Sequence, residues 1–260
     1  MTIEFRKYQG TGNDFVVLDN RSGIYKSLNQ DNIAFLCHRR FGIGADGLMM
    51  LQHKEGYDFE MKYFNADGAE GSMCGNGGRC IVQYAKDLKL IQDKTYFIAS
   101  DGPHSAVIND SGIIELQMKD VDGIEKRESG SILDTGSPHY IQAVTNLADW
   151  DVEAEGKAIR YNDEFRAKGI NVNFIEPFHD GIKIRTYERG VEAETLSCGT
   201  GATAAALSVA SDTTLPQTIQ VQTMGGLLQI KFVKKGGALF SNIWLCGPAK
   251  HVFNGIIYLP

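Results

Sequence analysis

Residues 64–80 have the sequence FNADGAEGSMCGNGGRC, and they are followed by IVQYAKDLKL, a run typical of a helix. Cys74 stands directly before Gly75-Asn76-Gly77-Gly78 at the expected helix start. Small residues there let a ligand approach the backbone, and the N–H groups of a first helical turn favour an anion and lower the pKa of a nearby thiol. The stretch therefore predicts a reactive thiol beside an anion-binding helix start.

The same arrangement occurs a second time. The segment Ser197-Cys198-Gly199-Thr200-Gly201 directly precedes the apolar run ATAAALSVA. Cys198 follows Cys74 by nearly half the length of the 260-residue chain. Each half offers strands, a glycine loop, a Cys-Gly-x-Gly unit with its helix, and hairpins with glycine turns. This coarse duplication, with one central helix per half, predicts two α+β domains that face each other across a cleft.

Composition excludes several classes of function. The hydrophobic share of 43% and the charged share of 22% are ordinary for a soluble globular protein. A net charge of −6 without a Lys/Arg cluster argues against nucleic acid as a partner. No apolar run approaches the roughly 20 residues that span a bilayer, and the N-terminus lacks the apolar segment of a signal peptide. The odd number of widely spaced cysteines favours reduced thiols in a cytoplasm: Cys37, Cys74, Cys80, Cys198 and Cys246.

Alternating and buried apolar runs predict the strands. The polar, glycine-containing segment 120–130 marks a domain boundary, and the last apolar run, VFNGIIYL, could return to the first half. We therefore expect one domain over residues 1–121 plus 248–260 and a second over 122–247. A short helix is expected over 31–40, a hairpin across Gly225-Gly226, and strands over 3–9, 15–19, 58–64, 131–134, 171–176 and 182–188.

Two common types of site are not predicted. The loop FGIGADG over residues 41–47 lacks the Gly-Lys-Ser/Thr ending of a phosphate loop and opens a strand rather than a helix, so we expect no nucleotide there. Cys80 lies roughly 240° around the helix axis from Cys74. No Cys-x-x-Cys or His-x-x-x-His pair occurs elsewhere, so a metal site is not expected either.

Several polar residues allow either a structural or a functional interpretation. Asn13 could belong to an ordinary hairpin turn after Gly12, or direct its amide at a ligand. A lone histidine is more often structural, but His139 is expected in the turn TGSPH. Glu188 and Arg189 could form a surface ion pair, although their place at a strand end shortly before Cys198 favours function.

Three hypotheses account for the two thiols. In the first, a thiolate removes a proton from one face of a carbon acid while the opposite thiol delivers another, and two helix starts stabilise the developing charge on the adjacent carboxylate. In the second, one cysteine is a covalent nucleophile with His139 as its base, which leaves the duplication unexplained. In the third, the pair is a redox switch or merely structural.

The motifs together resemble the diaminopimelate epimerase family. They occur in order over nearly the whole chain: GTGNDFVVLD, FGIGADGL, FNADG, MCGNGGRC, GSPH, NVNF, YERG and CGTGA. The resemblance implies two pseudo-symmetric domains, each of mostly antiparallel strands wrapped around a central helix, with the last segment returning to the first domain. It also implies interconversion of LL- and meso-2,6-diaminopimelate for lysine and peptidoglycan synthesis, without pyridoxal phosphate, other cofactor or metal.

Site residues follow from the resemblance position by position. Cys74 would be the base for the LL form and Cys198 the base for the meso form. The backbone of Gly75, Asn76, Gly199 and Thr200 would hold the reacting carboxylate. The other expected substrate contacts are His139 and Glu188 near the reacting centre, and Asn13, Asn65, Asn171 and Arg189 elsewhere. An arginine–carboxylate pair at the distal end would select a diamino diacid over a simple amino acid.

The chain departs from the family pattern at three places. Ser137 stands where asparagine is usual, Gly47 stands where some members have glutamine, and ERGVEAET is one residue longer than the commoner ERGxGET, so that this loop must bulge. These changes affect substrate affinity more than reaction type. A proline or hydroxyproline racemase is the nearest rival, although Arg189 favours a diacid. A homodimer is a further state that the sequence leaves open.

Overall fold

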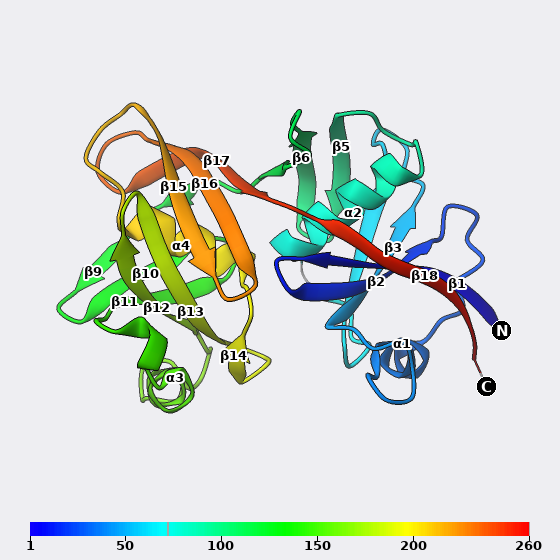
Figure 1. The fold of residues 1–260 in the computed structure, drawn as a ribbon, viewed down its shortest axis with the longest axis horizontal. Coiled ribbons are helices and arrows are strands. Elements are labelled where there is room, and N and C mark those ends of the chain that lie inside the picture. Colours follow the sequence, from blue (N-terminus) through cyan, green and yellow to red (C-terminus); the bar gives the residue numbers. More distant parts are fainter. Residues whose placement is uncertain (72, 260) are drawn as a thin grey trace. The chain divides into compact units, whose positions relative to one another are not determined.

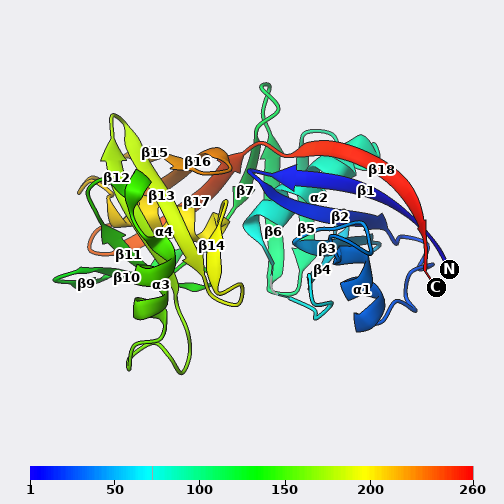
Figure 2. The ribbon, with the colours of Figure 1, turned by 60° about the horizontal axis from the view of Figure 1, so that its bottom comes forward.

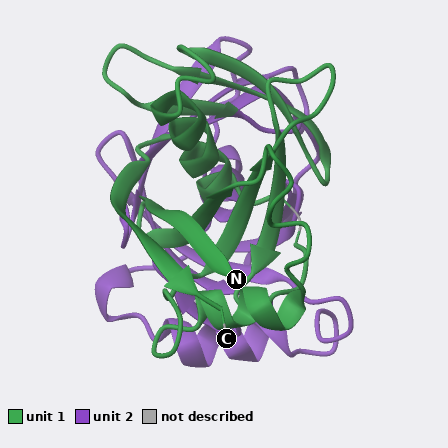
Figure 3. Cartoon of the chain, turned by 90° about the vertical axis from the view of Figure 1, so that its right-hand side faces the viewer, with its two compact units in different colours: residues 1–116, 247–260 green, residues 117–246 purple. Residues whose placement is uncertain are grey.

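The computed structural model describes residues 1–71 and 73–259 of the chain. It contains two compact units, the first formed by Met1–Leu116 with Gly247–Pro260 and the second by Gln117–Cys246 (Figure 3). The sequence-based division into 1–121 plus 248–260 and 122–247 stays a prediction. In the described part of the chain, no helix has the length and apolar character needed to cross a membrane.

Unit 1 is a strand layer in the order β18-β1-β2-β3-β4-β5-β6-β7, with α1 and α2 packed on it (Figures 1 and 2). The pairs β2–β3 and β4–β5 are parallel, and the other neighbours are antiparallel. The elements are β1 Thr2–Gly10, β2 Asn13–Asp19, α1 Gln30–Cys37, β3 Gly47–Gln52, β4 Glu60–Asn65, α2 Gly75–Asp87, β5 Lys94–Ala99, β6 Gly102–Ile108, β7 Ile114–Gln117 and β18 Lys250–Tyr258.

The last strand returns to the first. β18 pairs antiparallel with β1, with Ile3 opposite Ile257, and both belong to one apolar cluster that also includes side chains of α1. Alternating burial along β1 reflects the period-two pattern of its sequence, which places one face on the core. The segment VFNGIIYL thus pairs with the first strand of the chain.

Unit 2 also consists of strands packed around a central helix, but its strands and helices differ in length from those of unit 1. Its strands follow the order β9-β10-β11-β12-β13-β15-β16-β17-β8, β14 pairs with β13, and β11–β12 and β13–β15 are parallel. The elements are β8 Val121–Asp122, β9 Glu125–Arg127, β10 Gly130–Asp134, β11 Pro138–Ala143, η1 Leu147–Asp149, α3 Val152–Arg160, β12 Asn171–Phe178, β13 Gly181–Glu188, β14 Ala193–Thr195, α4 Gly199–Ser208, β15 Pro216–Thr223, β16 Gly226–Lys234 and β17 Leu239–Gly247.

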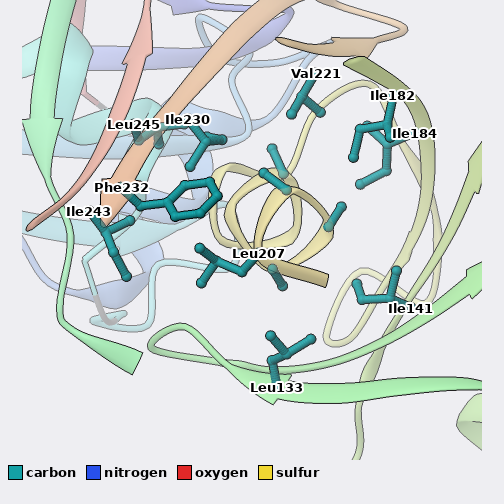
Figure 4. Packing of buried hydrophobic residues seen from close by; sticks show 14 of the residues in the cluster. Leu133, Ile141, Ile182, Ile184, Leu207, Val221, Ile230, Phe232, Ile243 and Leu245 are labelled. Atoms are coloured by element: carbon teal, nitrogen blue, oxygen red, sulfur yellow. The ribbon is translucent and has the colours of Figure 1, made fainter. Parts of the chain in front are cut away.

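A buried helix lies at the centre of each unit, as expected. The strands of unit 2 surround α4, and apolar side chains such as Leu133, Ile184 and Phe232 converge on it from several directions (Figure 4). A helix that is buried nearly all round needs no polar face, and α4 is accordingly rich in alanine. In unit 1, α2 packs on β1, β2 and β3 and is buried along most of its length.

Two helical details differ from expectation. The helix predicted over 31–40 is α1, and it ends earlier, at Cys37, because His38 is extended. α3 was not predicted. It begins after Asp151, whose side chain accepts from the Ala154 N–H, and it packs on β12, β13 and β14. Its nine residues are mostly polar and include Gly156 in the interior of the helix, where glycine is unfavourable.

Candidate functional site

Cys74 is the N-cap residue of α2. Its backbone is extended, its carbonyl accepts the first helical hydrogen bond from Gly78 at 2.7 Å, and its thiol takes no part in capping. An added Cβ on Gly77 would approach Cys74 Cβ at 3.6 Å, and one on Gly78 would lie 2.5 Å from Met73 Cε. Glycine at both positions therefore lets neighbouring side chains pack closely on the first turn of α2, beside the Cys74 thiol.

Asn13, at the start of β2, connects this thiol with the loop before β3. Its Oδ1 accepts from the Cys74 thiol at 3.6 Å and from Asn76 Nδ2 at 3.4 Å. Its Nδ2 donates to Asp46 Oδ2 at 2.6 Å. The β1–β2 hairpin turns at Thr11 and Gly12, both with positive φ, which brings Asn13 to the helix start.

Charged side chains hold the loop that carries Asp46. Arg39 bridges Asp14 and Asp46 at 2.8 and 2.6 Å, while the Lys7 ammonium pairs with Asp14 at 2.7 Å and donates to the Gly44 carbonyl. Burial alone would raise the pKa of Asp14, but the hydrogen bonds from Arg39 and Lys7 lower it below its usual range. The glycine-containing loop 41–47 is thus held in place by ion pairs.

Arg79 lies beneath the same helix start and is fully buried. Its guanidinium donates to Asn76 Oδ1 at 3.0 Å and to Thr11 Oγ1 at 3.1 Å. Arg79 is not among the site residues predicted from the sequence, although it is part of the motif MCGNGGRC. The burial of an arginine at the fifth position of a helix depends on tertiary contacts that a motif does not reveal.

Asn65 ends β4, opposite Gly47 in the register of β3 and β4. It is exposed, and its Oδ1 would lie 3.1 Å from a Cβ added to Gly71. A Cβ on Gly47 would lie 2.6 Å from the Phe64 carbonyl oxygen and 2.7 Å from Tyr63 Cε2. The close packing of β4 therefore leaves no room for a side chain at position 47.

In unit 2, Cys198 caps α4 in the same way. Its backbone is extended, its residue surface is 9% exposed, and its Sγ lies 3.4 Å from Thr200 Oγ1. Thr200 also contacts His139, whose Nε2 lies 2.9 Å from the same hydroxyl, and its carbonyl accepts from Thr135 Oγ1 at 2.9 Å. The structure thus brings Cys198, Thr200 and His139 together.

His139 lies in β11, not in the turn that the sequence suggested, and it is fully buried. Pro138 and His139 pair with the end of β10 and the start of β12, because the chain re-enters the sheet directly after Ser137. Burial, followed by the nearby charge of Arg189, lowers the pKa of His139 to about 3. The imidazole is therefore neutral at physiological pH.

Asn171 and Arg189 meet at Ser137. Asn171 donates through Nδ2 to Ser137 Oγ at 2.9 Å and to the Pro138 carbonyl at 3.0 Å, and its Oδ1 accepts from the Arg189 N–H at 3.0 Å. Arg189 Nη2 donates to the same Ser137 hydroxyl at 3.2 Å. Ser137 thus holds the arginine and the amide that the resemblance assigns to the substrate.

Glu188 ends β13, and its carboxylate accepts from Thr195 Oγ1 at 2.8 Å. The longer loop that follows forms a β13–β14 hairpin, in which Gly190 and Glu192 have positive φ and the Glu192 N–H donates to the Glu188 carbonyl. The extra residue is accommodated in this turn, close to where the sequence predicted a bulge.

The other cysteines lie in cores. Burial raises the pKa of Cys37 to about 12 and also raises that of Cys80 well above its ordinary value. All five cysteines are free thiols in the structure. Within residues 1–71 and 73–259, no three His, Cys, Asp or Glu side chains gather as metal ligands would.

Solved structures define the class of fold. A phenazine biosynthesis protein of the PhzF family from Bacillus anthracis matches with a TM-score of 0.77 at 15% identity, over 100% of both chains. A hydroxyproline epimerase from Agrobacterium vitis matches with a TM-score of 0.69 at 14% identity, over 98% of this chain and 92% of that one. The chain therefore has the duplicated α+β fold of these proteins.

Sequence relatives specify the family. The profile described as "Diaminopimelate epimerase" matches residues 5–128 and 131–252. Diaminopimelate epimerase from Flavobacterium psychrophilum is 49% identical over 257 residues, covering 98% of this chain and 100% of that protein. The enzyme from Chlorobaculum tepidum is 41% identical over 260 residues, covering 96% and 99%. This chain belongs to the diaminopimelate epimerase family.

Proposed function

We propose that the protein interconverts LL- and meso-2,6-diaminopimelate without a cofactor, in the synthesis of lysine and of peptidoglycan precursors. The observation that carries the proposal is the repeated placement of a cysteine as the N-cap of a buried helix, at Cys74 and at Cys198. Family membership supports the choice of substrate, because relatives that cover nearly the whole chain bear this name.

The reaction needs a base and an acid on opposite faces of one α-carbon. In the LL-to-meso direction, the Cys74 thiolate takes the α-proton, and the electron pair is left on the carbanion and its carboxylate. The Cys198 thiol then gives its proton to the other face and becomes a thiolate. The reverse direction exchanges the two roles, so the net result is inversion with no oxidation or reduction.

The carboxylate next to the reacting carbon gains charge in the transition state. We assign its binding to the backbone N–H groups of Gly75, Asn76, Gly199 and Thr200, which lie in the first turns of α2 and α4. Such donors act where charge develops, and the loss of one typically costs about 3–4 kcal/mol. The glycines in both first turns keep these N–H groups accessible.

The other expected contacts would recognise the remainder of the substrate. Arg189 and Asn171 are held together through Ser137, and Arg189 is suited to a carboxylate at the distal end. Asn13, next to Cys74, has amide groups for a polar substrate atom. Asn65, His139 and Glu188 complete the proposed set.

Two alternatives remain distinguishable by experiment. A proline or hydroxyproline racemase would use a similar thiol pair but no distal carboxylate site. A thiol redox switch would show reversible oxidation and no epimerisation. The family relatives favour diaminopimelate over the first, and the presence of two matched helix starts favours catalysis over the second.

The test is incubation with LL-diaminopimelate in heavy water. We expect meso product with solvent deuterium at one α-carbon, detected by mass spectrometry and chiral chromatography. Deuterium exchange of proline or hydroxyproline, with none in diaminopimelate, would replace the proposal with the racemase alternative. No exchange in any of these amino acids would reject catalysis of this type.

Location and assembly are further parts of the proposal. Five free thiols support a cytoplasmic location, since oxidising compartments favour disulfides. A homodimer is supported by exposed apolar side chains on β18, namely Val252, Phe253, Ile256 and Tyr258. Light scattering that gives a monomer mass at micromolar concentration would exclude the dimer.

A further inference from the structure

The amide of Asn173 has an orientation that its neighbours determine. Asn173 is fully buried in β12, and its Nδ2 lies 3.1 Å from the carbonyl oxygen of Tyr140. On the other side, the hydroxyl of Thr186 on β13 donates to Asn173 Oδ1 at 2.9 Å. A carbonyl oxygen can only accept a hydrogen bond, so the NH₂ group must face Tyr140 and the amide cannot be reversed without loss.

This orientation decides the tautomer of His139. Asn173 Nδ2 also lies 3.1 Å from His139 Nδ1, which is nearer than the Asn171 carbonyl oxygen at 3.4 Å, so the ring nitrogen is the better acceptor for its second hydrogen. Nδ1 must then accept, and the single proton of the neutral ring resides on Nε2. Nε2 lies 2.9 Å from Thr200 Oγ1, so the imidazole donates to that hydroxyl.

The same donor-to-acceptor direction extends to the sulfur of Cys198. Because Thr200 Oγ1 accepts from His139, its own hydrogen is available to the Cys198 sulfur at 3.4 Å. A hydrogen bond donated to an anion is stronger than one to a neutral acceptor. The bond thus stabilises the thiolate of Cys198 more than its thiol.

We propose that Asn173 is a positioning residue, which fixes His139 as the Nε2–H tautomer and thereby directs the Thr200 hydroxyl to the Cys198 thiolate. The inference rests on the proposed function for its catalytic meaning. No proton passes along the chain of hydrogen bonds: the substrate's α-proton forms the new S–H bond at Cys198, and His139 keeps its proton throughout.

The packing around α4 supports this arrangement. A Cβ added to Gly201 would lie 2.5 Å from Asn173 Oδ1 and 3.3 Å from His139 Cε1. Glycine at position 201 therefore lets β12 and β11 bring both side chains against the first turn of the helix. This close packing explains the second glycine of the motif CGTGA.

The direct test is the tautomer of His139. Protein labelled with ¹⁵N-histidine is examined by long-range ¹H–¹⁵N correlation, with the His139 signals assigned by their loss in His139→Gln. We expect the Nε2–H pattern, unchanged between about pH 5 and pH 8. In Asn173→Asp, the carboxylate must accept from the ring, so we expect a proton on Nδ1. An Nδ1–H pattern in the wild type, or an unchanged pattern in Asn173→Asp, would overturn the inference.

The second test follows the hydroxyl. Thr200→Val keeps the shape and removes the donor, and we expect kcat to fall about 10- to 100-fold with KM changed less than about threefold. Thr200→Ser should recover most of this loss. Thr203→Val is the matched control, because that buried hydroxyl on the same helix donates only to the Gly199 carbonyl in the described contacts. Equal losses in Thr200→Val and Thr200→Ser would contradict a role for the hydroxyl.

A measurement made without substrate distinguishes failure of the proposed function from failure of the positioning role of Asn173. In a Cys74→Ala background, the alkylation rate of Cys198 by iodoacetamide at neutral pH, followed by mass spectrometry, should fall in Thr200→Val and Asn173→Asp. If diaminopimelate is not a substrate but the tautomer and the alkylation rates behave as stated, the proposed function fails and the positioning role stands. If the enzyme is active and the alkylation rate of Cys198 is unchanged in both variants, the positioning role of Asn173 is wrong.

Discussion

The buried guanidinium of Arg79 donates from Nη1 to the side-chain oxygen of Asn76 at 3.0 Å, within the first turn of α2. This bond turns Asn76 Nδ2 toward Asn13, which in turn accepts from the Cys74 thiol. A charge in the interior thus aligns two amides beside the sulfur. In unit 2, the corresponding alignment uses neutral groups, Asn173 and His139.

Replacement of Arg79 by methionine should destabilise unit 1. The variant keeps much of the side-chain volume but leaves the buried polar atoms of Asn76 and Thr11 with fewer partners, so we expect a loss of about 2–4 kcal/mol in the free energy of unfolding. Urea denaturation followed by circular dichroism measures it. Arg40→Met, at an exposed position, should change stability by less than about 0.5 kcal/mol. Similar midpoints for both variants would refute this role of Arg79.

Loss of either catalytic thiol should abolish epimerisation. Cys74→Ala and Cys198→Ala each remove one of the two groups that exchange protons with the α-carbon, so we expect turnover to fall at least about 1000-fold. A coupled assay of the meso product measures it. Cys37→Ala provides the control, because that thiol is buried in an apolar cluster formed by α1 and strands β1, β2 and β3. Full turnover by either of the first two variants would end the two-base mechanism.

Ser137→Ala should weaken substrate binding more than chemistry. The change removes the acceptor that Asn171 and Arg189 share, which leaves the guanidinium less ordered. We expect KM to rise about tenfold with kcat nearly constant, as for a contact made equally in ground and transition states. Steady-state kinetics with diaminopimelate tests it. If kcat falls and KM does not change, Ser137 acts on the chemical step instead.

Gly47→Gln, which introduces a long side chain at a closely packed position, should be poorly tolerated. Its side chain would meet the Phe64 carbonyl and the Tyr63 ring, so β3 and β4 must separate. We expect a loss of more than about 2 kcal/mol in unfolding free energy. Gly56→Ala is the control: it meets nothing within 4 Å and costs only the strain of its positive φ, roughly 1 kcal/mol. An unchanged melting temperature for Gly47→Gln would contradict the packing argument.

The ion pairs of Asp14 should make stability depend on pH at the acid end. Because the folded-state pKa of Asp14 lies below its unfolded value of about 3.9, the carboxylate stabilises the protein above that pH and loses its effect as pH falls through the folded-state pKa. We expect wild type to melt well above Asp14→Asn at neutral pH, with the gap narrowing toward pH 3 or so. A gap that is constant or widens on acidification would reverse the assigned sign.

The sequence predicted what depends on local pattern. Repeated Cys-Gly units located both central helices, alternation located the long strands, and paired glycines located the β15–β16 hairpin. It did not reveal α3, whose polar sequence becomes helical against β12 to β14. The position of His139 in a strand was missed because Gly-Ser-Pro favours a turn, whereas the parallel pairing with β12 is a long-range contact.

Partners of the candidate residues were the least predictable part. Asn13, Asn171 and Arg189 follow from the resemblance, but Arg79, Asn173 and Thr186 act through other side chains. A single sequence does not indicate which buried amide will contact which imidazole ring. Asn173 has a partial signal, since alternation in NVNF places it on the same strand face as Asn171.

The alanines of α4 limit how this scaffold can diversify. With side chains no larger than a methyl group at Ala202, Ala204, Ala205 and Ala206, the surrounding strands approach the helix closely, and there is no slack into which it could slide or rotate. Because Cys198 is the N-cap residue of this helix, its sulfur is held in place as well. New substrate preferences in such a chain should therefore arise from the strand ends and their turns, while the proton-transfer geometry stays unaltered.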